Sequence, residues 1–267
     1  MKFFSGFGKG FTSFFKAFGF VFEKGLWHFL FYPLILWIIL LLVGIYLTDS
    51  LGDYIQTLID EQLATIPEEG HWLSWLKNFE NGWFGFIVAW ILKIFLWFIS
   101  GTFMKYITLI LLSPVFSLLS EAAAVKLGGK APNFDMGQLM KDILRGTMIS
   151  LRNMFFEYTL MFICFVLCMV FPPLAIIATP FMFFAGWYFI GFSMLDYSCE
   201  RNRMGVIESI RFIRSNMGLA CGLGFCYSII MWLPLLGMIF SPIMAVTGAT
   251  LAFEEFKQKQ SNVQKAI

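Results

Sequence analysis

The stretch FLFYPLILWIILLLVGIYL, residues 29–47, runs for 19 residues without a charged side chain. A helix needs about 20 apolar residues to cross the hydrocarbon core of a bilayer, which is about 30 Å thick. The whole 267-residue chain is 59% hydrophobic and only 13% charged, and it contains 34 Phe and 9 Trp. With so few polar side chains, most of its exterior must face lipid rather than water. The sequence therefore predicts an all-α, polytopic integral membrane protein and excludes soluble and disordered classes.

A long second span is predicted at residues 83–121. This block is apolar apart from a few side chains, and a continuous helix of its length would exceed one bilayer crossing. Proline removes a backbone hydrogen bond and disfavours helix at the residue before it, so we predict a break at Ser113-Pro114. The crossing then ends near Leu112, and an inner extension continues to Glu121.

Two later apolar blocks, residues 153–197 and 218–253, have proline near the middle and basic residues close to both ends. Each is therefore predicted to be a helical hairpin that starts and ends on the cytoplasmic side. The arms are long enough for full crossings, but neither turn carries a charged residue. A turn that emerges into water usually carries polar residues, so the tips favour re-entrant hairpins buried in protein or lipid.

Residues 1–28 form an amphipathic amino-terminal arm. Seven Phe cluster on one face of the predicted helix, and three Lys lie on the opposite face. These residues are Phe4, Phe7, Phe11, Phe14, Phe15, Phe18 and Phe22, and Lys2, Lys9 and Lys16. We expect an uncleaved helix that lies in the membrane interface with its Phe face toward lipid. The alternative is a helix packed on the protein's own membrane domain.

The segments between the apolar blocks differ in charge. Residues 48–82 form a predicted outer loop with a strong acidic excess, whereas the predicted inner loop at 122–152 is basic overall. Residues 198–217 predict an amphipathic helix at the inner interface, and residues 254–267 a polar tail. Because basic loops stay in the cytoplasm, both termini are predicted to lie there and the acidic loop outside.

The order and spacing of several short blocks resemble those of a known family. The blocks are Ser113 to Glu121 before Gly128-Gly129, Leu195-Asp196-Tyr197 with Arg201, Glu208 to Arg214, Leu233 to Gly237, and Ser241 to Thr250. Together they cover nearly the whole chain, which resembles the CysZ-type sulfate permeases and the related etoposide-induced-protein membrane domain. The resemblance implies two full spans, two re-entrant hairpins, an oligomeric assembly, and passive inward movement of sulfate for cysteine synthesis.

The resemblance also implies an anion site at the start of the first long helix. Sulfate-permeable members have a Gly-Leu-Arg motif there, whose arginine binds the anion together with backbone amides. This sequence reads Lys24-Gly25-Leu26-Trp27-His28, with Trp27 at the arginine position. A helix amino terminus can hold an oxyanion without a cation, and Lys24 or a protonated His28 would add only a point charge. An interfacial anchor is the favoured role for Trp27, and hydrogen bonds to water or lipid explain His28 equally well.

Ionisable residues at membrane depth are further candidates for function. Lys93 and Lys105 are expected to snorkel to opposite interfaces, with a pore role for Lys93 as the alternative. Glu157 lies just inside the first hairpin. It is predicted to pair with Arg152 or Arg145 at the inner surface of the membrane.

Asp196, Glu208 and Arg211 are predicted to form a structural ion-pair set, with a permeation role as the alternative. Cys164 and Cys168 share a helical face, but no His or carboxylate converges with them, so we predict neither a metal nor a redox site. The sequence contains only two His and shows no phosphate-binding glycine loop and no nucleophile elbow. We therefore expect no enzyme activity, no cofactor and no nucleic-acid partner.

The leading hypothesis is a permease or channel of the inner membrane for a small oxyanion, with sulfate as the first candidate. Its partners are then the lipid bilayer, the inorganic anion and further copies of the same chain. The rival hypothesis is a non-transporting membrane scaffold that keeps the same fold and organises partners or lipid. The acidic outer loop argues against the first hypothesis, because it would repel an arriving dianion. Physiological salt weakens this repulsion, since it screens charges that are more than about 8 Å apart.

Overall fold

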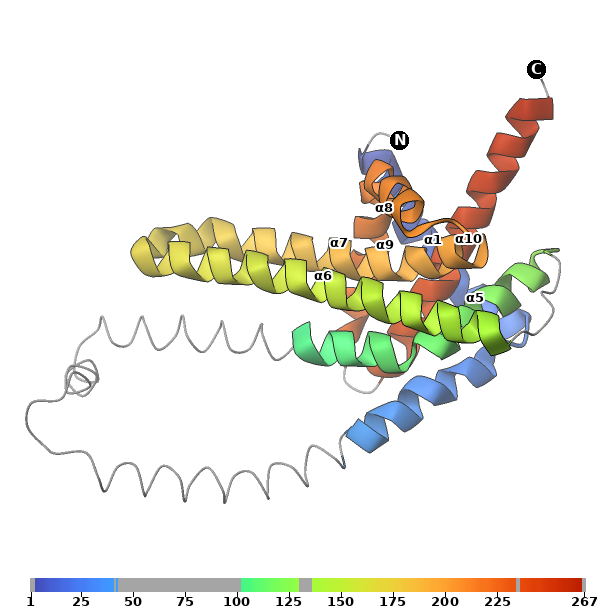
Figure 1. The fold of residues 1–267 in the computed structure, drawn as a ribbon, viewed down its shortest axis with the longest axis horizontal. Helices are drawn as coiled ribbons and strands as arrows, with labels where there is room; N and C mark the ends of the chain where they lie inside the picture. The colour runs from blue at the N-terminus through green and yellow to red at the C-terminus, as the bar shows by residue number, and fades with distance from the viewer. Residues whose placement is uncertain (1–2, 41, 43–101, 130–135, 234–235, 266–267) are drawn as a thin grey trace, which may run out of the picture. The chain divides into compact units, whose positions relative to one another are not determined.

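The computed structural model describes residues 3–40, 42, 102–129, 136–233 and 236–265. The chain divides into two units, one made of Met1–Leu34 and Thr102–Ile267 and the other of Ile35–Gly101. In the second unit the described residues are 35–40 and 42, and all are helical. The described elements of the first unit are helical as well, which confirms the all-α prediction (Figure 1). The predicted acidic loop, Lys93 and most of the second span lie outside the described residues.

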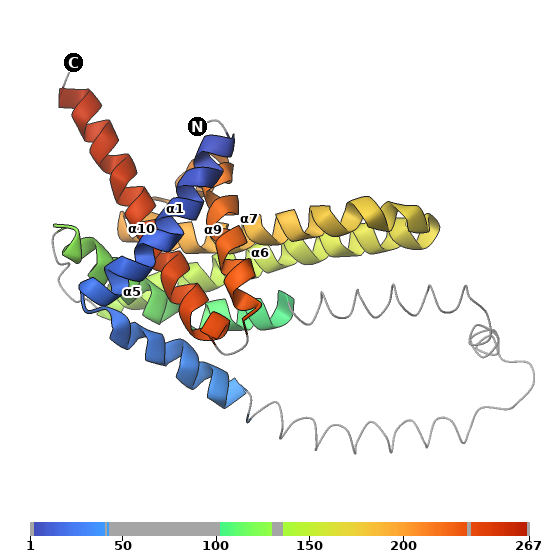
Figure 2. The same ribbon diagram turned by 180° about the vertical axis from the view of Figure 1, so that it is seen from behind.

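Helix α1, Phe3–Glu23, packs against α9, Met217–Met231, and α10, Leu236–Lys265 (Figure 2). Small residues allow this close approach. A Cβ atom on Gly10 would lie 2.9 Å from the backbone nitrogen of Leu223, and one on Gly222 would lie 3.2 Å from the Cα of Gly10. Such backbone contact is typical of membrane helices that meet through small residues.

The structure therefore agrees with the alternative for the amino-terminal arm, a helix packed on the protein itself. Its buried stripe consists of Gly6, Gly10, Ser13, Phe14, Ala17 and Val21. Phe14 thus belongs to the protein interface, whereas Phe4, Phe11, Phe15 and Phe22 are exposed. Lys9 and Lys16 both form ion pairs with Glu255 on α10. Their ammonium groups lie 3.3 and 3.7 Å from its carboxylate.

The first and second spans are both joined to neighbouring helices by sharp bends. The chain bends by 113° between Phe3–Glu23 and Trp27–Leu40, and by 62° between Thr102–Leu111 and α5, Ser113–Lys126. Pro114 lies in the first turn of α5, at the predicted break. Proline is well tolerated there, because its missing N–H would have no partner within the helix.

The first hairpin consists of α6, Met136–Val170, the short 3₁₀ turn η2, Pro172–Leu174, and α7, Ala175–Arg201. Its turn falls at Pro172-Pro173, near the middle of the predicted block. The prediction of an inner loop over residues 122–152 is wrong, because α5 continues to Lys126 and α6 already begins at Met136. Lys141, Arg145 and Arg152 therefore project from α6 rather than from a loop, so they keep fixed spacing.

The second hairpin joins α9 to α10, and α8, Val206–Ser215, precedes it. α10 continues through the predicted polar tail to Lys265, so that segment is helical where it is described. The apolar side chains of α8 are only partly covered: Ile213 is buried, whereas Val206 is exposed, as is Met217 at the start of α9.

Three helical stretches in the described part of the chain are long and apolar enough to cross a membrane, namely Met140–Val170, Pro172–Arg201 and Leu236–Lys259. Counting each bent pair as one span raises the number to five. The protein is therefore a multi-pass membrane protein. Both arms of the first hairpin have the length of a full crossing, whereas α9, with 15 residues, is shorter than the about 20 residues that a crossing needs.

Candidate functional site

The residues Lys24 to His28 lie at the bend that follows α1. Gly25 has a positive φ of 73°, a conformation that glycine adopts readily, and Leu26 is buried. The side chain of Trp27 is 51% exposed and packs edge-on against Phe31. The ring nitrogen Nδ1 of His28 lies 3.1 Å from the carbonyl oxygen of Gly25.

Two backbone amides of this bend already have acceptors. The N–H of Gly25 donates to the carbonyl oxygen of Phe22 at 3.3 Å, and the N–H of Leu26 donates to that of Val21 at 2.9 Å. These amides close the last turn of α1, as at many helix ends. An anion at this position would therefore have to rely on the next amides along the chain and on nearby cations.

A buried ion pair connects Thr102–Leu111 with α6. The ammonium nitrogen of Lys105 lies 2.6 Å from each carboxylate oxygen of Glu157, and the hydroxyl of Tyr106 donates to Glu157 Oε2 at 2.8 Å. Sequence reasoning predicted that Lys105 would snorkel to an interface and that Glu157 would pair with Arg152 or Arg145. The structure instead pairs the two membrane-depth charges with each other, which reduces the cost of burying either one.

A second ion pair links the two arms of the first hairpin. Arg145 on α6 donates through Nη2 to Asp196 of α7 at 3.1 Å and to the hydroxyl of Ser209 of α8 at 3.1 Å. Its Nη1 donates to the carbonyl oxygen of Met204. Arg145 thus ties α6, α7 and α8 together at one end of the hairpin.

The predicted ion-pair set of Asp196, Glu208 and Arg211 is therefore arranged differently. Asp196 is paired with Arg145, Glu208 accepts a long hydrogen bond from the N–H of Gly205 at 3.4 Å, and Arg211 is exposed on α8. No local pattern reveals the true partner of Asp196, because Arg145 is 51 residues away in the sequence.

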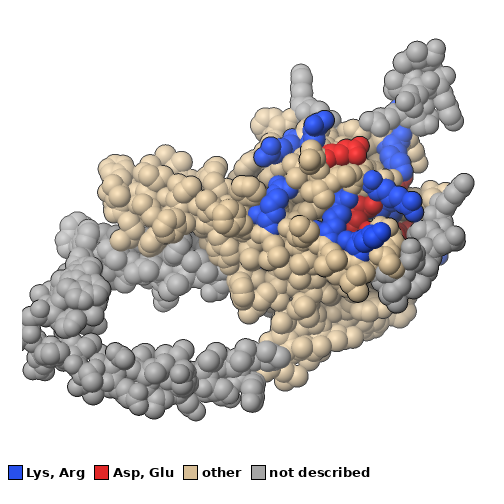
Figure 3. All heavy atoms as spheres, viewed as in Figure 1, with Lys and Arg blue, Asp and Glu red and all other residues tan. Residues whose placement is uncertain are grey.

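A cavity of about 710 Å³ lies beside this cluster. Six charged residues are among those that line it: Lys141, Asp142, Arg145, Arg152, Glu200 and Arg203. Basic side chains outnumber acidic ones in this lining, and such an excess of positive charge favours anions over cations. Figure 3 shows basic side chains gathered over the same end of the described helices, away from the tip of the α6 and α7 hairpin.

The uncharged half of the hairpin contrasts with this end. Between Glu157 and Asp196 the sequence contains no Asp, Glu, Lys or Arg. Many large side chains there are exposed, among them Phe162, Val170, Ile176 and Ile177. This apolar surface suits contact with lipid, and it leaves polar chemistry to the other end of the hairpin.

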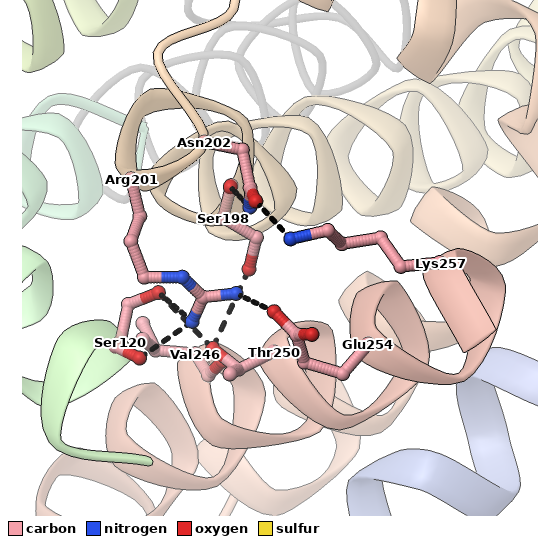
Figure 4. A network of polar contacts seen from close by, with 8 residues as sticks. All are labelled: Ser120, Ser198, Arg201, Asn202, Val246, Thr250, Glu254 and Lys257. Carbon is pink, nitrogen blue, oxygen red and sulfur yellow. Dashed lines mark hydrogen bonds and ion pairs between the residues drawn. The ribbon is translucent and has the colours of Figure 1, made fainter. Parts of the chain in front are cut away.

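Another polar network joins α5, α7 and α10 (Figure 4). Arg201 donates to the carbonyl oxygen of Ser120 at 2.6 Å and forms an ion pair with Glu254. The hydroxyl of Thr250 lies 3.2 Å from that of Ser120 and 3.4 Å from that of Ser198. Because the guanidinium is held by groups on two other helices, this network fixes helix positions rather than presenting a free cation.

The described residues contain no group of three or more His, Cys, Asp or Glu side chains that could hold a metal ion. Cys164 and Cys168 are free thiols on α6.

Comparison with known protein families decides the class of the protein. Residues 13–242 match the model of the family described as Sulfate transporter CysZ/Etoposide-induced protein 2.4. The chain belongs to this family.

The sequence is also similar to curated members of the CysZ family. A sulfate transporter CysZ of Pseudomonas paraeruginosa is 26% identical over 186 residues, which is 68% of this chain and 75% of that protein. A sulfate transporter CysZ of Pseudomonas aeruginosa matches with the same identity and coverage. The family is one of transporters rather than enzymes, in line with the lack of a recognisable catalytic motif in the sequence.

Two features of this CysZ-family member were missed by sequence reasoning. One is the pairing of Lys105 with Glu157, because each residue was considered only within its own helix. The other is the cavity, because Lys141, Arg145 and Arg152 were assigned to a loop. Their spacing of four and seven residues fits one face of a helix and was the available signal.

Proposed function

We propose that the protein is a membrane permease or channel for a small oxyanion, with sulfate as the leading substrate. The observation that carries the proposal is the net-basic cavity at the charged end of the apolar α6 and α7 hairpin. A cavity lined by excess positive charge and bordered by low-dielectric walls raises the local concentration of anions. The sulfate transporters among the relatives support sulfate as that anion.

The proposal includes a location and a physiological role. The protein lies in the inner membrane with both termini in the cytoplasm, forms homo-oligomers, and admits sulfate passively for cysteine synthesis. The basic residues around the cavity support this orientation, since basic segments stay on the cytoplasmic side. The exposed apolar surface of the hairpin supports contact with lipid or with further copies of the chain.

The bend at Lys24 to His28 is proposed as a second, weaker anion contact. Without the family arginine it offers the amides near Trp27, the ammonium of Lys24 and the imidazole of His28. A point charge on a flexible side chain binds an oxyanion less specifically than a bidentate guanidinium. Most of the affinity for sulfate is therefore assigned to residues outside this bend.

Uptake into liposomes tests the function. Purified protein is reconstituted, and the entry of labelled sulfate is compared with that of protein-free vesicles, with and without an imposed proton gradient. Faster entry that does not depend on the gradient supports a passive permease.

The scaffold hypothesis is the second candidate, and the exposed Trp27 at the arginine position favours it. If sulfate, thiosulfate, selenate and phosphate all fail to enter faster than in empty vesicles, the permease proposal is refuted and the scaffold remains.

A further inference from the structure

We propose that Arg152 is the main oxyanion-binding side chain of this protein and that it acts within the cavity beside α6 and α7. This inference rests on the proposed function and names the residue that would carry it. It differs from the expectation for the bend at Lys24 to His28, where the arginine is missing.

Arg152 is a cation that has been partly removed from water without a carboxylate in contact with it, although Asp196 attracts it from a longer distance. Its guanidinium carbon lies 5.0 Å from the ring centre of Phe192 and 5.6 Å from that of Phe156. Its Nη1 is buried and makes no hydrogen bond with any described residue, and it forms no ion pair within the described part of the chain. A charged donor in this state is costly, and an oxyanion would lower that cost.

The other cations of the lining are less suited to hold an anion. Arg145 is engaged by Asp196, Ser209 and Met204. Lys141 and Arg203 are exposed, so water screens their charge. Arg152 is therefore the lining cation that is neither hydrogen-bonded to a carboxylate, as Arg145 is, nor exposed, as Lys141 and Arg203 are.

The acidic residues of the lining lie at the other end of the cavity. The contact of Arg145 with Asp196 sets the alignment of the antiparallel helices α6 and α7. Arg152 lies two turns beyond Arg145 on α6, toward the hairpin tip. Glu200 lies one turn beyond Asp196 on α7, away from the tip. At 1.5 Å per residue their levels differ by about 16 Å along the hairpin. Repulsion between Glu200 and an anion at Arg152 is therefore weak after screening.

The chemistry of the site selects for oxyanions. A guanidinium presents parallel N–H groups that match two oxygens of one anion, which a spherical halide cannot use. The cavity of about 710 Å³ exceeds the about 30 Å³ that one water molecule occupies in the liquid many times over, so an anion would keep part of its hydration. Partial hydration keeps binding weak enough for release, which conduction requires.

Equilibrium binding of labelled sulfate to the purified full-length protein in detergent tests this assignment. We expect Arg152→Gln to raise the Kd for sulfate about 10- to 100-fold, the range for losing a charge-assisted contact. Arg152→Lys keeps the charge without the paired N–H groups, and we expect an intermediate Kd. Lys126→Gln removes one exposed positive charge from the end of α5, outside the cavity, and should leave the Kd unchanged. Chloride should compete poorly with sulfate in the wild type and more effectively in Arg152→Lys, which lacks the paired N–H groups.

The outcomes separate this inference from the proposed function when liposome uptake is measured alongside. If wild type binds and transports sulfate but the folded Arg152→Gln variant binds it equally well, the Arg152 assignment is overturned and the permease stands. If wild type binds sulfate at Arg152 but does not transport it, the site stands and the permease fails. If wild type neither binds nor transports sulfate, both fail. Should Arg152→Gln misfold, an unchanged Kd in Arg152→Lys together with equal competition by chloride would overturn the assignment.

Discussion

Glu157→Leu should destabilise the protein strongly, because it leaves the ammonium of Lys105 buried without its partner. In the ion pair, the side chains of Lys105 and Glu157 are only 12% and 5% exposed, and the ammonium lies 2.6 Å from both carboxylate oxygens. Removing one partner of such a buried ion pair lowers the free energy of unfolding by about 3 to 5 kcal/mol. The hydroxyl of Tyr106 also loses its acceptor, which adds to the loss.

The double variant Lys105→Met, Glu157→Leu removes both charges and is the decisive comparison. Replacing a buried pair by apolar residues of similar volume is often neutral or stabilising, so we expect the double variant to recover most of the stability lost in the single one. Lys9→Gln is the matched control, since it breaks an ion pair with the more exposed Glu255 and should cost no more than about 1 kcal/mol.

Thermal unfolding of the detergent-purified proteins measures these differences. At about 2 to 4 °C per kcal/mol, the single variant should unfold roughly 6 to 20 °C lower than wild type. A shift of less than about 3 °C, or a double variant that is no more stable than Glu157→Leu, would contradict the buried ion pair.

Three further predictions follow from the fold and the site. Gly10→Val should destabilise the protein by about 1 to 3 kcal/mol in thermal unfolding, because the new side chain would meet the backbone of α9. Gly8→Ala is the control: its new methyl group would meet nothing within 4 Å, so the variant should be neutral or slightly stabilised. Equal effects of the two substitutions would contradict the packing of α1. A cysteine reporter at Gly70 should react with an impermeant outside reagent and one at Gly129 should not, and the reverse pattern would invert the proposed orientation. Trp27→Arg should strengthen sulfate binding about 10- to 100-fold in calorimetry if the bend is an anion contact, and no gain in a folded variant would exclude that role.

Much of the helix layout could be predicted from the sequence because its determinants are local. Composition indicates the membrane class. Proline disfavours helix at the residue before it, which is enough to predict the breaks at Pro114 and Pro172, although Pro180 and Pro242 lie within α7 and α10. Helix ends in polar segments were placed poorly. The segment before residue 152 was assigned to a loop because it is charged, yet the charged residues lie on a helix that starts at Met136. Charge alone does not distinguish a solvated helix from a loop.

The candidate site could be predicted only in part. The lack of an arginine at Trp27 is visible in the sequence once the family is recognised. The surroundings of Arg152 cannot be predicted from the sequence, because Phe192 belongs to another helix and lies 40 residues away in the chain. A residue's distance from water and from opposite charges depends on which helices pack together, and no local pattern contains that information.

By itself, the sequence determined that this is a helical, multi-pass membrane protein with helix breaks near Pro114 and Pro172. Those properties follow from apolar length and backbone sterics, which act on each segment independently. Only the tertiary structure decided that Lys105 pairs with Glu157 across 52 residues and that Arg145 pairs with Asp196 across 51. It also placed Arg152 close to the rings of Phe156 and Phe192 in the lining of a cavity with more basic than acidic residues. The physical reason is that burying a charge is favourable only with a suitable partner nearby, and that partner is chosen by helix packing rather than by neighbours in the chain.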